Sequence, residues 1–216
     1  MTVVYLHALP LDERMWPEGV DAPRLYGPGR TLDEWADGVL AAYPGELVLV
    51  GASMGGYCAL AAVRRAPERI AGLVLAGSRP DADSPERRAK RAETIALARK
   101  RGAEGIWRSM RELLFAPDAD PALVARIGEI ALDRTEEELV TAIEAVRDRP
   151  DSTQAYLGLR DRALTIIGDR DPYVPVEAAQ AWDADTVVLP GCGHLPSLER
   201  PAEFDRLIEE AVARWT

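Results

Sequence analysis

Six short apolar runs, each bounded by turn-forming residues, constrain the fold of this chain more than any other feature. They cover residues 2–6, 22–26, 46–50, 70–77, 162–168 and 186–190. Their apolar residues are continuous rather than alternating, which suits strands that are buried on both faces, as in a parallel sheet. The sequence therefore predicts a mostly parallel sheet of about six strands.

Helical patterns separate most of these runs. Residues 31–43 carry an apolar stripe at i, i+3, i+4, i+7 and i+8 spacing, made by Leu32, Trp35, Ala36, Val39 and Leu40. Residues 54–68 are rich in small side chains, which predicts a helix packed closely on the sheet. Residues 201–215 begin with a proline at a first helical position. Strands that alternate with helices predict an α/β fold whose sheet is flanked by helices.

Residues 84–158 interrupt this alternation, because they contain no strand-like run and are punctuated by prolines. They carry three apolar stripes at helical spacing. The stripes are Trp107, Met110 and Leu114; Leu123, Val124, Ile127 and Ile130; and Leu139, Ile143 and Val146. We expect one domain over residues 1–216, with a core at 1–83 and 159–216 and an insertion of three or four helices at about 84–158.

The overall charge and hydropathy exclude several classes of partner. The net charge of −10, from 26 basic and 36 acidic residues, would repel phosphate backbones, and no dense basic patch offsets it. No apolar run approaches the roughly 18 residues that cross a bilayer. The N-terminus lacks the basic and cleavage-site features of a signal peptide. We expect a cytoplasmic protein without nucleic-acid or membrane partners, either a monomer or a homodimer.

Cysteine and histidine are scarce in this chain. Cys58 and Cys192 do not make a disulfide framework, and we expect both to be small buried residues. The two histidines are His7 and His194, and their spacing from the cysteines matches no metal-binding motif. We therefore expect no metal, and any histidine base must be one of these two residues.

The stretch LVLVGASMGG, residues 47–56, fits the pattern G-x-S-x-G between a strand and a helix. In that motif the serine has a strained backbone, so Gly51 and Gly55 must be small. The turn exposes Ser53 Oγ above the strand ends, over a helix N-terminus whose amides can stabilise an oxyanion. The competing interpretation is a glycine-rich tight turn with an unreactive serine.

A serine nucleophile needs a base and an acid. His194 lies in a loop directly after the run 186–190, and strand-end loops are where open parallel sheets bind ligands. Asp169 and Asp171 follow the preceding run, so the order Ser, Asp, His agrees with the motif. The alternatives are a histidine in a surface turn and an aspartate that only caps a turn.

The loop LHALPLDERMW after the first run is the expected second source of oxyanion donors. We predict that the Leu9 amide pairs with the amide of Met54, the residue after the nucleophile. His7 stands at the strand end, where ordering the loop through hydrogen bonds is a better interpretation than proton transfer.

With these motifs, the chain resembles the α/β-hydrolase superfamily, in its small single-domain branch of esterase-like and haloperoxidase-like members. The resemblance covers nearly the whole chain and makes the insertion a helical lid. The family's acid stands three residues after a strand-end glycine, which from Gly168 gives Asp171. The chain departs from the family at His7-Ala8, where His-Gly is usual, and in lacking an N-terminal strand pair. One sheet edge is therefore expected to be open or covered by a partner.

The resemblance and the motifs together imply a serine hydrolase for small or medium carboxylic esters, with Ser53, Asp171 and His194 as its triad and no cofactor. Trp107, Met110 and Phe115 are candidates for an apolar acyl pocket, although aromatic residues and methionine at helical spacing also suit a simple core. The same triad supports thioester, carbon–carbon bond, lyase or perhydrolysis chemistry. A ligand-binding receptor with little turnover is the alternative outside enzymes.

Overall fold

The fold is centred on a parallel five-stranded sheet, seen in a computed structural model that describes residues 1–27, 29–182 and 185–215. The strands follow one another across the sheet in chain order. They are β1 (Thr2–Leu6), β2 (Leu47–Ala52), β3 (Ile70–Ala76), β4 (Ala163–Gly168) and β5 (Asp185–Leu189). Five of the six predicted runs are thus confirmed as strands.

The sixth predicted strand, at residues 22–26, was wrong. In its place the chain makes one isolated bridge beside β1, where the Tyr5 amide donates to the Asp21 carbonyl at 2.8 Å. Pro23 has no amide hydrogen to extend the pairing, and the Leu25 amide donates to His7 Nε2 instead. The side chains of Leu25 and Tyr26 are buried all the same, which explains why the pattern of this run was that of a strand.

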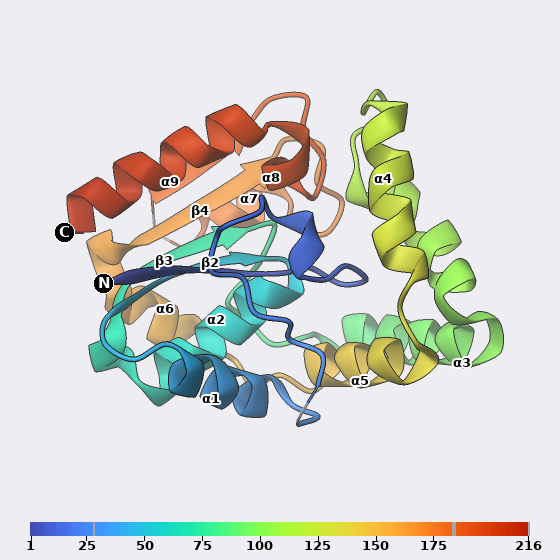
Figure 1. The fold of residues 1–216 in the computed structure, drawn as a ribbon, viewed down its shortest axis with the longest axis horizontal. Coiled ribbons are helices and arrows are strands. Elements are labelled where there is room, and N and C mark those ends of the chain that lie inside the picture. Colours follow the sequence, from blue (N-terminus) through green and yellow to red (C-terminus); the bar gives the residue numbers. More distant parts are fainter. Residues whose placement is uncertain (28, 183–184, 216) are drawn as a thin grey trace.

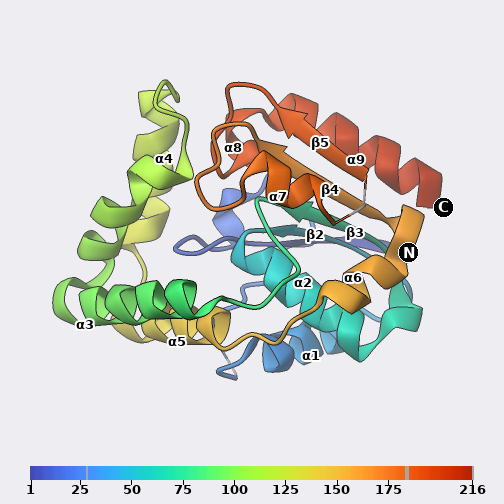
Figure 2. The ribbon, with the colours of Figure 1, turned by 180° about the vertical axis from the view of Figure 1, so that it is seen from behind.

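Helices cover both faces of the sheet (Figures 1 and 2). One face carries α1 (Leu32–Ala42), α2 (Met54–Arg65) and α6 (Thr153–Leu159), and the other carries α9 (Pro201–Trp215). Two short helices accompany the last strands, namely α7 (Val176–Gln180) and α8 (Pro196–Glu199). The predicted helices at 31–43, 54–68 and 201–215 are therefore confirmed within a few residues at their ends.

Each central strand divides its side chains between two hydrophobic clusters. Leu49 and Leu73 face the layer of α1 and α2, whereas Val50 and Val74 face the layer of α9. All four are fully buried, which at about 1.5–3 kcal/mol for each large apolar side chain drives sheet and helices together. The free cysteines Cys58 and Cys192 are buried in the same two clusters, as expected.

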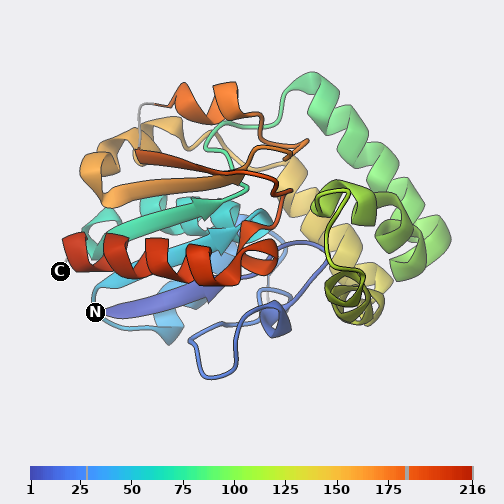
Figure 3. The ribbon, with the colours of Figure 1, turned by 90° about the horizontal axis from the view of Figure 1, so that it is seen from above.

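The segment between β3 and β4 forms four helices, within the predicted number. Three of them, α3 (Pro85–Leu114), α4 (Pro121–Leu132) and α5 (Glu136–Arg147), lie beyond the carboxyl ends of the strands (Figure 3). The fourth, α6, packs beside α2 on the face of the sheet that α1 and α2 cover. Helix α3 changes direction at Gly102, whose φ of 56° and ψ of −152° suit glycine. This bend brings the second half of α3 back over the strand ends.

A buried ion pair joins this group of helices to the loop after β1. Arg134, between α4 and α5, contacts Asp12 with 2.8 Å between Nη2 and Oδ2, and the two side chains are 1% and 0% exposed. Asp12 also caps the short 3₁₀ helix Glu13–Met15 by accepting from the Arg14 amide. The loop is thus fixed to both the sheet and the helices beyond it.

No helix in the described ranges is long and apolar enough to cross a membrane.

Candidate active site

Ser53 occupies the sharp turn between β2 and α2. Its φ of 49° makes it the one non-glycine residue with positive φ among those the structure describes. A Cβ on Gly51 would come within 2.5 Å of the Gly56 backbone, and one on Gly55 within 2.1 Å of the Leu6 carbonyl oxygen. The predicted need for small residues on both sides of Ser53 is therefore confirmed, and its cause is steric.

His194 links Ser53 to Asp171 through short polar contacts. Its Nε2 lies 2.9 Å from Ser53 Oγ, and its Nδ1 lies 2.8 Å from Asp171 Oδ2. The second carboxylate oxygen, Oδ1, accepts from the amides of Tyr173 and Val174 at 2.7 and 3.1 Å. These contacts favour the tautomer in which Nδ1 donates to Asp171, leaving Nε2 to accept the proton of the Ser53 hydroxyl.

Parallel strands bring these three residues together. Ser53 follows β2 directly, Asp171 comes three residues after β4, and His194 comes five residues after β5. Because the strands are parallel, their carboxyl ends meet at one edge of the sheet. Asp171 and His194 are 6% and 3% exposed, so their contact is shielded from water.

Asp169, the other acid in this loop, has a different set of partners. Its Oδ1 accepts from the amides of Gly191 and Cys192 at 2.8 and 3.3 Å. It therefore caps the loop that carries His194 and does not contact the imidazole. The position counted from Gly168 in the sequence is the one that lies beside His194.

Leu9 and Met54 line a small pocket of about 30 Å³ together with Ser53 and His194. Met54 is the first residue of α2, so its amide has no acceptor within that helix. The Leu9 amide donates to no residue of the described ranges. Neither amide therefore has a hydrogen-bond acceptor among the described residues, and both remain candidates for oxyanion donors.

His7 is the first residue of the loop after β1, and it is fully buried. Its Nε2 accepts from the Leu25 amide at 2.9 Å, and its Nδ1 lies 3.2 Å from the Ala8 carbonyl oxygen. Burial lowers the pKa of His7 to about 4, so the ring is neutral at physiological pH. This environment agrees with a residue that orders the loop.

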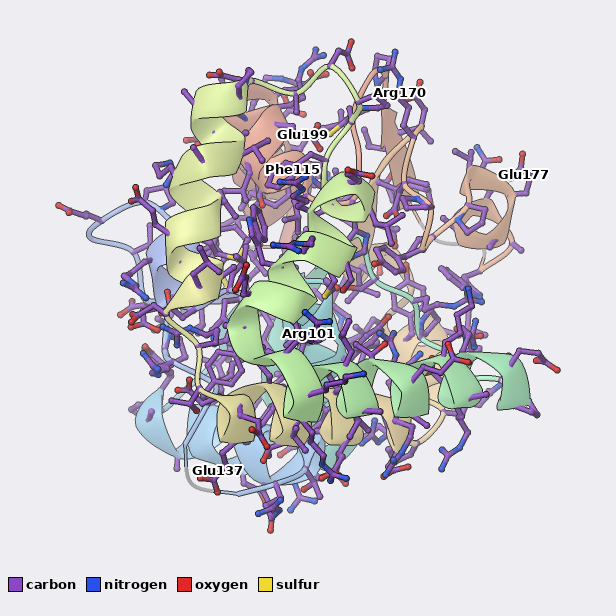
Figure 4. The ribbon with its side chains drawn as sticks, turned by 90° about the vertical axis from the view of Figure 1, so that its right-hand side faces the viewer. Arg101, Phe115, Glu137, Arg170, Glu177 and Glu199 are labelled. Carbon is purple, nitrogen blue, oxygen red and sulfur yellow. The ribbon has the colours of Figure 1, made fainter. Side chains whose placement is uncertain are left out.

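Glu199, in α8, is a residue that the sequence analysis did not single out. Its Oε1 accepts from the Gly193 amide and its Oε2 from the Ala116 amide, both at 2.8 Å. Figure 4 shows it close to Phe115, at the end of α3. The carboxylate thus fastens the loop of His194 to the end of α3, where the His194 amide also donates to the Leu114 carbonyl. An acid in a short helix gives no sequence signal of this role.

The small pocket adjoins a larger one of about 350 Å³, and five residues line both. They are Leu9, Tyr57, Arg91, Met110 and Tyr173. Of the three residues predicted for an apolar pocket, Met110 thus lines both. Trp107 and Phe115 line neither; their rings pack edge to face at 6.5 Å, and they belong to the hydrophobic cluster that includes α4.

Comparisons with known proteins identify a family and several similar chains. A family model described as the alpha/beta hydrolase family matches residues 3–207. The chain is 29% identical to the pimeloyl-[acyl-carrier protein] methyl ester esterase of Aromatoleum aromaticum, over 97% of both chains. The solved structure of a thermophilic esterase from Thermogutta terrifontis, with malate bound, matches with a TM-score of 0.89. It is 28% identical, and the match covers 100% of this chain and 90% of that one.

We predict that His7 makes stability depend on pH. Its pKa is about 4 in the folded chain and about 6.5 in an unfolded one. The contribution of neutral His7 to the free energy of unfolding is therefore fully present above pH 6.5. It is lost as the pH falls toward 4, which lowers the free energy of unfolding by about 3 kcal/mol. Urea unfolding between pH 7 and 4 should show a smaller fall in the free energy of unfolding for His7→Gln than for wild type. Equal falls would contradict the neutral buried ring.

Proposed function

Because the chain belongs to the α/β-hydrolase family, we propose that it is a serine esterase that cleaves small or medium carboxylic esters through an acyl-enzyme on Ser53. The observation that supports this proposal most is the continuous contact from Ser53 Oγ through His194 to Asp171 at the strand ends. Both relatives described above are named as esterases, which favours an ester as the bond that is cleaved.

In the first step of the proposed mechanism, Ser53 Oγ attacks the acyl carbon while His194 Nε2 takes its proton. Asp171 holds the imidazole in the orientation required and stabilises its positive charge. The amides of Leu9 and Met54 donate to the oxyanion, and each such donor is worth roughly 3 kcal/mol in comparable sites. His194 then gives the proton to the leaving alcohol, and the acyl group remains on Ser53.

In the second step, water attacks the acyl-enzyme and His194 acts as the base again. The carboxylic acid leaves and Ser53 regains its proton. Each step begins and ends with a neutral imidazole, so the residues of this chain provide every proton transfer. The proposed reaction requires no cofactor.

We also propose that α3, α4 and α5, within the insertion at about residues 84–158, act as the lid of this site. Met110 in α3 lines the pockets at Ser53, and the end of α3 is hydrogen-bonded to the His194 loop through the Leu114 carbonyl. The lid would therefore shape the substrate pocket and support the base at the same time.

Ser53→Ala tests the proposed nucleophile. We expect kcat/KM for p-nitrophenyl acetate to fall by about 10⁴-fold or more, because no acyl-enzyme can form. The fold should persist, since alanine has the same backbone requirements at this turn, and circular dichroism checks that. Turnover equal to wild type would exclude Ser53. A panel of thioesters and carbon–carbon bond substrates separates esterase activity from other chemistry of the same triad.

Asp171→Asn and Asp169→Asn form a matched pair. The first substitution would place an amide beside His194 Nδ1 and disturb its tautomer, so we expect kcat to fall by about 10³–10⁴-fold. The second retains an oxygen that accepts from the amides of Gly191 and Cys192, so we expect a loss below about 10-fold. Ester hydrolysis at pH 7 measures both. A larger loss in Asp169→Asn than in Asp171→Asn would reverse the assignment of the acid.

A further inference from the structure

Three arginines surround one buried carboxylate beside the larger pocket. The Asp83 side chain is 1% exposed and lies 2.8 Å from Arg149, 3.2 Å from Arg87 and 3.2 Å from Arg91. A second carboxylate, Asp81, pairs with Arg87 and with Arg79, which also lines this pocket, so two carboxylates face four guanidinium groups. This corner of the pocket therefore carries excess positive charge, although the protein as a whole has a net charge of −10.

Two of these arginines have further partners within the protein. Arg149 donates to the carbonyls of Val146 and Asp81, and its guanidinium lies 4.0 Å from the centre of the Tyr57 ring. Arg87 pairs with Asp81 and donates to the Ala82 carbonyl. Their remaining role is structural, because they hold the chain before α3 in place.

Arg91 differs from both. Its Nε contacts Asp83, but its two terminal nitrogens have no hydrogen-bond partner within the described ranges. Its side chain is 22% exposed, and it lines both the pocket at Ser53 and the larger pocket. A partly buried guanidinium with free donors at a substrate pocket favours a planar anion, because its parallel N–H groups match two carboxylate oxygens.

The rest of the larger pocket suits a short apolar chain that ends in a negative charge. Leu9, Leu97, Met110 and Leu113 provide apolar surface. Lys90 and Glu93 also line the pocket, and their opposite charges offset each other, although Lys90 forms no ion pair with a described residue. Arg79 also lines the pocket, but Asp81 binds it through two contacts at 2.5 and 2.9 Å. The free positive charge is therefore concentrated on Arg91.

We propose that this pocket binds a carboxylate on the substrate, and that Arg91 selects esters which carry a free carboxylate at the far end of a short chain. Monoesters of dicarboxylic acids have this chemistry. The proposal rests on the esterase activity proposed above and adds the substrate class. Arg91 would bind the substrate and take no part in proton transfer.

The test compares two substrates of equal length, monoethyl adipate and the matching ethyl ester with a terminal amide. We expect wild type to prefer the charged ester in kcat/KM, and Arg91→Gln to lose at least about 10-fold of that preference. Arg91→Lys should retain part of it. Arg99→Gln is the matched control, because Arg99 lies on the same helix, is 60% exposed, pairs with Glu144 and does not line the pocket. It should keep the wild-type preference.

The outcomes separate this proposal from the esterase proposal. If wild type cleaves the amide-terminated ester equally well, or if Arg91→Gln keeps the wild-type preference, the carboxylate site is overturned while the esterase remains. If wild type cleaves p-nitrophenyl acetate but neither of these two esters, the carboxylate site is likewise overturned while the esterase remains; if it cleaves none of the three, both proposals fail. A stronger preference for an ester with a terminal phosphonate would overturn the choice of a carboxylate. Weaker competitive inhibition by adipate in Arg91→Gln than in wild type would support it without reference to turnover, and thermal unfolding checks that each variant is folded.

Discussion

The strained backbone of Ser53 is the constraint on which the candidate site depends. A positive φ at a residue with a side chain costs about 1–3 kcal/mol, and the surrounding contacts hold it in place. The Ser53 amide donates to the Ala76 carbonyl and the Ser78 hydroxyl donates to the Ser53 carbonyl, both at 2.8 Å. Glycines on each side allow α2 to approach β1 and β2 without a clash. The ends of β2 and β3 and the start of α2 are thereby fixed around one hydroxyl group.

The loop that carries His194 is held from three directions. Asp169 caps its first residues, Glu199 accepts from Gly193, and the carbonyl of Leu114 accepts from the His194 amide. Two of these three contacts connect to the end of α3, since Glu199 also accepts from Ala116. The helices beyond the strand ends therefore support the base as well as covering the pocket. A substitution at the end of α3 can therefore alter the position of the His194 imidazole without contacting it.

Much of this arrangement could be predicted from the sequence because it follows local rules. Continuous apolar runs predicted all five described strands correctly. The G-x-S-x-G pattern and the order Ser, Asp, His led to Ser53, His194 and two candidate acids, and the family's spacing from Gly168 selected Asp171, which lies in contact with His194. The run at 22–26 failed because its apolar side chains are buried without strand pairing, and the partner of its backbone is the His7 ring. A continuous apolar run indicates that its side chains are buried, but it does not indicate that its backbone pairs with a neighbouring strand.

Other residues could not be found from the sequence, since their roles depend on contacts between distant segments. Glu199 and Arg91 resemble ordinary charged residues of exposed helices, and only the folded chain brings one to Ala116 and the other to the pocket of Ser53. Trp107 and Met110 belong to one apolar stripe, yet Met110 lines the pocket while Trp107 packs against Phe115.

The central claim is that Ser53 is the nucleophile, activated by His194. A fluorophosphonate probe followed by peptide mass mapping tests it most directly, because the probe forms a covalent bond with an activated serine. The account predicts one adduct, on the peptide that contains Ser53, absent in Ser53→Ala and much slower to form in His194→Ala. An adduct on another residue, or equal labelling of Ser53→Ala, would contradict it.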